Sequence, residues 1–186
     1  GNKNCYLLSI RYDNGKTIGF LLDCGQSIPQ WDEDETGAGL DWNHVPNFSA
    51  IPEEIDHIEA VIISHAHRDH DGGLNKLFEF LMNSQTFRGK PSLPEVIMPQ
   101  YAANMLQSRE YRALSARPSQ LDEGYTIASH YKFGINNNYL RVVDGNSREV
   151  FRIGDGLWHN FDDVEFEESD VVFKIFQVNH SVADSL

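Results

Sequence analysis

Runs of apolar residues divide the first third of the chain into strands. Two such runs, 5–12 and 17–23, flank a turn at 13–16 whose Asn-Gly pair is a strong β-hairpin signal. The segment 53–64 predicts a short helical turn that leads into a buried strand, because its last five residues, AVIIS, are almost continuously apolar. Between the hairpin and this strand, the polar stretch 26–52 contains Gly and Pro and favours a loop.

From residue 73 onward, helical and strand patterns alternate. Apolar residues within 73–82 keep the i, i+3, i+4, i+7, i+8 spacing of one buried helix face: Leu74, Leu77, Phe78, Leu81 and Met82. A strand is predicted at 95–98 and a helix at 100–114, and short strands follow at 139–143, 149–153 and 171–178. Hairpin strands mixed with helices predict an α/β (α+β) fold built of layers and argue against an all-β barrel.

Length and cysteine content set the broad class of the protein. A chain of 186 residues suits one domain, and no window approaches the roughly eighteen consecutive apolar residues of a membrane span. Two cysteines are too few for a disulfide framework, so a cytoplasmic protein is expected. We interpret Cys5 and Cys24 as small buried side chains, with a bridge or a metal site as the alternatives. Because the chain starts at Gly1, we expect that an upstream segment has been removed.

The formal net charge of −13 limits the partners of the protein. Nonspecific binding of polyanions is disfavoured, because affinity for a phosphate backbone depends on clustered Lys and Arg. A nucleic-acid enzyme is still possible, because divalent metals add positive charge where a phosphate must lie. Part of the acid is in the run 162–170, which we interpret as a solvated loop because it lacks the spacing of an EF-hand calcium loop.

Three of the eight histidines lie within six residues, directly after the strand AVIIS. His65 and His67 are two residues apart, so on extended backbone their side chains point the same way and can converge on one metal ion. Asp69 and His70 follow after the chain turns and can face a second ion. Imidazole and carboxylate ligands together suit zinc or manganese, in a site that leaves room for water.

A loop of surface histidines is the alternative interpretation of this cluster. It is disfavoured because three histidines and an aspartate at the end of a buried strand are costly to bury without a metal. Gly72 and Gly73 follow the cluster and would let the backbone pass close beneath the site. The other histidines lack such spacing and are interpreted as ordinary surface or hydrogen-bonded residues: His44, His57, His130 and His159.

The pattern H-x-H-x-D-H after a hydrophobic strand, with Asp-x-Gly at 23–25, resembles the metallo-β-lactamase fold superfamily. The resemblance implies an αββα sandwich with one or two metals at the edge of a sheet. It also implies a further histidine from a later strand, and His180 at the end of the strand 171–178 is the candidate. The metal ligands implied in this chain are His65, His67, Asp69, His70 and His180.

The resemblance implies a role for each of these residues. His65, His67 and His180 would form the first metal site, completed by water or substrate. Asp69 and His70 would contribute to a second site, with Asp69 also the candidate general base that orients the attacking water. Zinc is the expected metal, with two sites in the complete protein, and manganese is the alternative.

Residues around these ligands are expected to support them. Asp23 is interpreted as a residue that hydrogen-bonds a metal histidine and fixes its tautomer, in preference to a ligand. Ser181 and Asp184 could contact a phosphate or support their loop, and the sequence does not separate these roles.

Two segments resemble the ribonuclease J and β-CASP group more narrowly. Residues 39–74 are similar to the segment around the ribonuclease J metal motif, and NHSVADSL at 179–186 resembles the segment around its third metal histidine. Arg68 and Asp71 depart from that pattern. The chain stops before the bridging aspartate, the β-CASP domain and the last metal histidine of that group. Residues 1–186 are therefore interpreted as the N-terminal half of a metallo-β-lactamase-like domain, whose remainder lies outside this chain.

The resemblance implies a metal-dependent hydrolase. A phosphodiesterase or nuclease that cleaves RNA or DNA through a metal-bound hydroxide is the leading hypothesis. The alternative is a small-molecule hydrolase of the same superfamily that acts on a thioester, a lactone or a cyclic phosphate. A non-catalytic binding protein is a third possibility, which the intact motif residues disfavour. Endo or exo cleavage, the native metal and the oligomeric state are open at this point.

Overall fold

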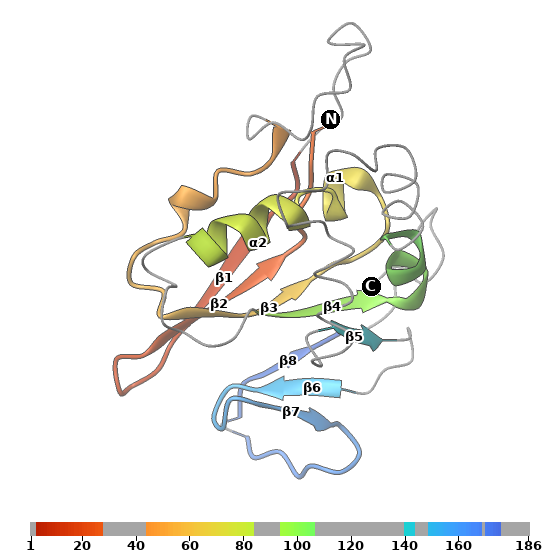
Figure 1. Cartoon of the computed structure of the whole chain (residues 1–186). Coiled ribbons are helices and arrows are strands. Elements are labelled where there is room, and N and C mark those ends of the chain that lie inside the picture. Colours follow the sequence, from red (N-terminus) through yellow and green to blue (C-terminus); the bar gives the residue numbers. More distant parts are fainter. Residues whose placement is uncertain are drawn as a thin grey trace, which may run out of the picture.

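The computed structural model describes residues 3–27, 44–83, 94–106, 140–143, 149–168 and 170–175, which form two β-sheets and several helical segments (Figure 1). Helix α2 lies across the larger sheet, and the smaller sheet lies on the opposite side. This mixed α/β architecture of layers confirms the predicted fold class. In the described residues, no helix is long and apolar enough to cross a bilayer.

The larger sheet has five strands in the order β1-β2-β3-β4-β5. The hairpin strands β1 (Tyr6–Arg11) and β2 (Thr17–Leu22) are antiparallel, as the Asn-Gly turn predicts. The next three strands pair in parallel: β3 (His57–Ile62), β4 (Glu95–Pro99) and β5 (Leu140–Val143). Because β2 to β5 run in parallel, the polar residues that follow β2 and β3 meet at one edge of the sheet.

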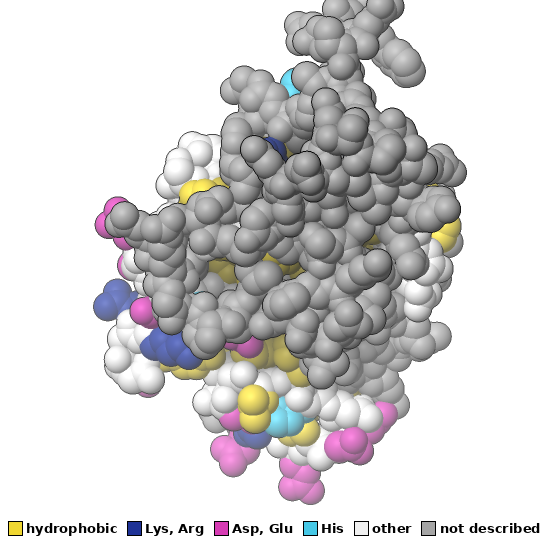
Figure 2. Space-filling model, in the orientation of Figure 1, with side chains coloured by type: hydrophobic (Ala, Val, Ile, Leu, Met, Phe, Trp, Pro, Cys, Tyr) yellow, Lys and Arg dark blue, Asp and Glu magenta, His cyan; other side chains and the backbone are white. Residues whose placement is uncertain are grey.

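The smaller sheet has three antiparallel strands in the order β7-β6-β8. These are β6 (Glu149–Arg152), β7 (Leu157–Asn160) and β8 (Val172–Lys174). The sequence pattern did not predict β7, whose four residues alternate poorly. Described acidic side chains of the run 162–170 are mostly exposed, and Figure 2 shows acidic groups gathered near this end of the molecule. For these residues, the solvated-loop prediction is confirmed.

Both faces of the larger sheet are covered, and each carries its own core. On one face, Leu21 and Val61 pack with Leu77 of α2 (Leu74–Asn83) and with the apolar residues of the helical segment 100–106. On the other face, Phe20 contacts the smaller sheet, with its ring centroid 5.0 Å from that of Phe151. The described residues thus form helix, sheet and sheet layers, which is an incomplete αββα sandwich.

Several boundaries differ from the sequence prediction. Strand β3 starts at His57, so residues 57–59 are extended, and the turn predicted before the strand is confined to 52–55, where the Ile55 N–H donates to the Pro52 carbonyl at 3.1 Å. The reason is tertiary: residues 57–59 continue the pairing with β2, which overrides the local pattern. A 3-10 turn, η2 (Phe48–Ala50), lies in the described part of the predicted loop. The helix predicted at 100–114 is seen as far as 106, and its remainder lies outside the described residues.

Candidate metal centre

The loop that carries the histidine cluster is held by backbone hydrogen bonds from the ends of β1 and β2. The loop contains α1 (Arg68–Asp71), a single helical turn in which the Arg68 carbonyl accepts from the Gly72 N–H at 2.9 Å. Three successive carbonyls accept N–H groups from the two strand extensions: Gln26 donates to Arg68, Asn4 to Asp69 and Cys24 to His70, at 2.8, 3.0 and 2.6 Å. The loop is therefore positioned by main-chain atoms, which leaves its side chains available for chemistry.

The glycines around this loop allow the backbones to approach closely. A Cβ added to Gly25 would overlap the carbonyl group of Asp69, and one added to Gly73 would lie 2.7 Å from the carbonyl oxygen of Gly25. Real Cβ contacts do not occur at such distances. The prediction that Gly72 and Gly73 let the chain pass close beneath the site is confirmed, and Gly25 explains the last position of Asp-x-Gly.

Three imidazole rings of the motif lie together at the sheet edge. The rings of His65 and His67 have centroids 4.6 Å apart, and their facing nitrogens, Nε2 and Nδ1, are separated by 3.0 Å. The centroid of His70 lies 4.0 Å from that of His65. His65 is 4% exposed, whereas His67 is exposed to solvent. The structure therefore brings together the three histidines that the motif predicts.

Asp23 and Ser64 form a hydrogen-bond network beneath these rings. Asp23 Oδ1 accepts the backbone N–H of Ser64 at 2.8 Å, and Oδ2 accepts the Ser64 hydroxyl at 3.1 Å. Since the hydroxyl proton is used in this way, Ser64 Oγ accepts from His65 Nδ1, 2.8 Å away. His70 Nδ1 lies 2.8 Å from Asp23 Oδ2 and donates to it. Both histidines are thus assigned the tautomer with a lone pair on Nε2, which a metal ligand requires.

The predicted hydrogen bond between Asp23 and a motif histidine is confirmed. Asp23 has a φ of +60°, in the left-handed region that Asp and Asn tolerate better than other side chains. Asp23 as a whole residue is 8% exposed. Asp23 is thus held in a position from which its carboxylate accepts from His70 Nδ1.

We predict that Asp23→Asn weakens metal binding by about 10–100-fold, the usual effect of losing the partner that orients a metal histidine. Asparagine keeps the shape and tolerates the same φ. It has only one acceptor oxygen, however, so it cannot replace both carboxylate oxygens that accept from Ser64 and His70. Chelator competition measures the affinity. Asp155→Asn is the matched control, because Asp155 accepts from His159 Nε2 at 2.8 Å on the distant hairpin. An equal loss of affinity in both variants would contradict the assignment.

The donor atoms form two pairs, each with a spacing that suits binding to one divalent metal ion. Two nitrogen ligands of a tetrahedral zinc ion are separated by about 3.3 Å when each bond is about 2.0–2.1 Å long. The 3.0 Å between His65 Nε2 and His67 Nδ1 is close to this value. Asp69 Oδ2 and His70 Nε2 are 3.7 Å apart and form a second pair. The described residues contain no group of three His, Cys, Asp or Glu arranged as a complete site, and His180, Ser181 and Asp184 lie outside them.

Two residues of the centre were missed by sequence reasoning. Ser64 directly precedes the motif, so its position at the strand end was a usable signal. Asn4 is 65 residues from Asp69 and belongs to no motif, yet its side-chain amide contacts both Asp69 and His70. Only the pairing of the β1 extension with the α1 loop brings it there.

The described histidines outside the motif each form a hydrogen bond with another side chain. His57 contacts Glu59 and His159 contacts Asp155, each at 2.8 Å, and His44 contacts Ser27 at 3.2 Å, whereas His130 lies outside the described residues. The interpretation of the three described histidines as hydrogen-bonded residues is therefore confirmed.

Both cysteines are free thiols. Burial raises the pKa of Cys24 well above its usual value, and a hydrogen bond from the Cys24 thiol lowers the pKa of Cys5. The alternative of a bridge is thus not present, and the interpretation of Cys24 as a small buried side chain is confirmed.

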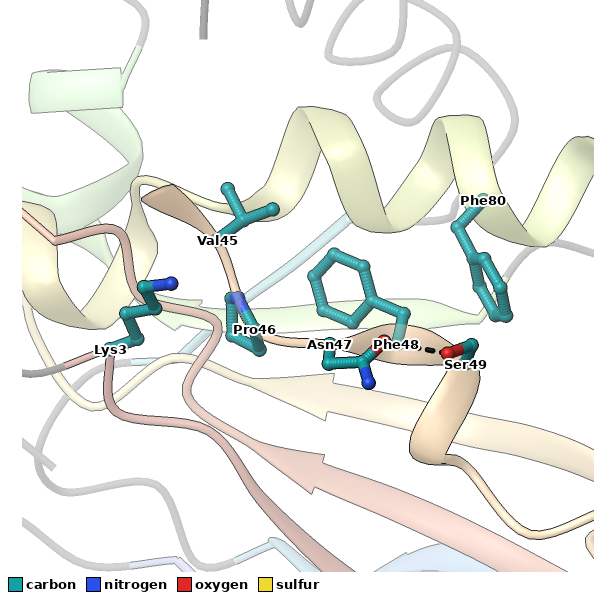
Figure 3. Close-up of a pocket in the computed structure, with 7 residues that line it drawn as sticks. All are labelled: Lys3, Val45, Pro46, Asn47, Phe48, Ser49 and Phe80. Atoms are coloured by element: carbon teal, nitrogen blue, oxygen red, sulfur yellow. Dashed lines mark hydrogen bonds between the residues drawn. The ribbon is translucent and has the colours of Figure 1, made fainter. Parts of the chain in front are cut away.

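A separate cavity of about 720 Å³ lies beside α2 (Figure 3). Its lining residues are Lys3, Val45, Pro46, Asn47, Phe48, Ser49 and Phe80. In Figure 3 the rings of Phe48 and Phe80 lie at one end and Lys3 at the other. None of the motif histidines lines this cavity, so the titratable cluster and the cavity are distinct features of the fold.

The chain matches the sequence family described as the metallo-beta-lactamase superfamily over residues 1–172. It is also similar to two proteins named transcription termination factor FttA. The one from Methanococcus maripaludis is 28% identical over 163 residues, which cover 80% of this chain and 24% of that protein. The one from Methanosarcina mazei is 26% identical over 176 residues, which cover 85% of this chain and 24% of that protein. The chain thus spans about a quarter of the length of these curated relatives.

Proposed function

Because the chain belongs to the metallo-beta-lactamase superfamily, we propose that it forms part of a metal-dependent hydrolase that cleaves phosphodiester bonds in RNA or DNA. The observation that carries the proposal is the cluster of His65, His67 and His70, in which the Nε2 lone pairs of His65 and His70 are directed away from the Asp23 and Ser64 network. The similarity to two proteins named as transcription termination factors supports a nucleic-acid substrate.

We assign the metal ligands as two groups. His65 and His67 would hold the first ion together with His180, and Asp69 and His70 would hold part of a second site. When bound, a divalent ion such as zinc or manganese supplies a nucleophile at neutral pH by lowering the pKa of water, and it stabilises charge on a phosphoryl group. The remaining ligands of the second site, and a β-CASP domain, are proposed to lie outside residues 1–186.

The side chains of this chain would then act as follows. Asp69 orients the attacking water and accepts its proton at the carboxylate, as a general base does. Asp23 keeps the proton of His70 on Nδ1, so the Nε2 lone pair faces the site. Backbone contacts from Asn4 and Gln26 hold the Asp69 loop in place, so the base does not have to be ordered during the reaction.

The test is a cleavage assay with the full-length protein encoded by the gene. We expect hydrolysis of labelled single-stranded RNA or DNA in the presence of zinc or manganese. Asp69→Asn should lower kcat by about 10²–10⁴-fold, the range for loss of a general base. Asp163→Asn, which alters an exposed carboxylate of the smaller-sheet region, should leave kcat unchanged. Intact RNA and DNA with both metals would contradict the proposed substrate.

The net charge of the protein favours the alternative substrate class, which is a small molecule. The net charge of −13 and the acidic groups visible in Figure 2 give the protein little attraction for a polyanion. A small thioester, lactone or cyclic phosphate would avoid this repulsion. Assays with these three substrates, on the same full-length protein, distinguish this alternative from a nuclease.

A further inference from the structure

The side chain of Asn4 lies between two proposed ligands of the second metal. Asn4 precedes β1 and is half-buried. Its Nδ2 atom is 3.2 Å from Asp69 Oδ2 and 3.0 Å from His70 Nε2. These two acceptor atoms are themselves 3.7 Å apart. One amide nitrogen thus bridges the two atoms that our assignment gives to one cation.

The orientation of the amide follows from its partners. A side-chain NH₂ group has two hydrogens, so Nδ2 can donate to the carboxylate and to the imidazole at once. His70 Nε2 can accept because Asp23 holds the proton of His70 on Nδ1, at 2.8 Å. With the amide flipped, its oxygen would face the Asp69 carboxylate and the lone pair of His70, and both contacts would be repulsive. The positive end of the amide dipole therefore faces the two acceptors.

The backbone of Asn4 fixes the side chain in this place. Its N–H donates to the Asp69 carbonyl at 3.0 Å, and its own carbonyl accepts from Gly25 at 2.8 Å. The residue is thus part of the strand pairing that holds the α1 loop. Only rotation of the side chain can remove the amide from the acceptors.

We propose that Asn4 competes with the second metal ion for Asp69 and His70. This proposal rests on the proposed function, because it concerns the same metal centre. The amide satisfies the two acceptors while no cation binds them, and it must rotate away before both can bind one ion. Those hydrogen bonds are lost on metal binding, so they lower the affinity of the second site. The Asn4 amide contacts Asp69 and His70, so we expect its competition to act on the second binding step.

The test is a stepwise metal titration of the full-length protein, measured by calorimetry and by chelator competition with manganese and with zinc. In Asn4→Ala, we expect the second binding step to tighten about tenfold, because two hydrogen bonds to a charged and an aromatic acceptor no longer oppose it. The first step should be unchanged. In the presence of chelator, Asn4→Ala should melt at a lower temperature than the unmodified protein. This difference in melting temperature should shrink when metal is added.

Two further variants make the test specific. Asn4→Ser keeps a polar side chain that is too short to span both acceptors, so it should reproduce the tighter second step if Asn4→Ala fails to fold. Asn104→Ala removes one exposed side-chain hydrogen bond, to Gln100, and should change neither step. An unchanged or weaker second step in both Asn4 variants would overturn the competition. Absence of metal binding in the unmodified protein would instead contradict the proposed function.

Discussion

The double variant His65→Ala, His67→Ala is expected to lose its bound metal. Zinc in protein sites is bound with an apparent free energy of roughly 10–16 kcal/mol over four ligands, or about 3 kcal/mol for each. Loss of two ligands from one site should therefore lower the affinity by about four orders of magnitude. Elemental analysis of the purified protein, before and after dialysis against chelator, measures this as a fall from near-stoichiometric metal to background.

The matched control is the double variant His57→Ala, His159→Ala. Both of these histidines lie on strands and pair with a carboxylate at 2.8 Å, but neither lies in the motif. The control should retain the full metal content. Equal metal in both double variants would contradict the assignment of His65 and His67. A protein without metal in its unmodified form would instead favour the non-catalytic alternative, if residues beyond Leu186 were present in the sample.

The grouping of the motif side chains was largely predictable because it depends on residue types at short spacing. His65, His67 and His70 are separated by two and three positions, so local backbone geometry alone brings them to one end of a strand. The Asp23 contact was predicted from the Asp-x-Gly pattern and is confirmed by its hydrogen bond to His70. These inferences needed no knowledge of tertiary packing beyond the adjacency of two strand ends.

The role of Asn4 was not predictable for the opposite reason. Its contact with Asp69 spans 65 residues and depends on where the extension of β1 pairs with the α1 loop. That pairing uses backbone atoms, which carry no signature in a single sequence. Strand β7 was missed in a similar way, because Leu157–Asn160 becomes a strand through pairing with β6 and has little strand pattern of its own.

The backbone support of the site is tested most directly at Gly25. A Cβ at this position would overlap the carbonyl group of Asp69, and the nearest atoms are backbone, which cannot rotate away. Gly25→Ala should therefore lower the free energy of unfolding by roughly 1–3 kcal/mol or more, the usual cost of overpacking a rigid site. Urea denaturation of the variant and of the unmodified protein, in the presence of chelator, measures this difference.

Gly154→Ala is the matched control for this variant. Nothing lies within 4 Å of a Cβ at Gly154, in the turn between β6 and β7, so its effect should stay within about 0.5 kcal/mol. Equal stability of the two variants would mean that the α1 loop moves away from Gly25 without cost. The metal titration then separates two roles of the Asp-x-Gly motif. Weakened second-site binding in a folded Gly25→Ala protein would show that this glycine sets the position of Asp69, because the substitution displaces the loop that carries the carboxylate.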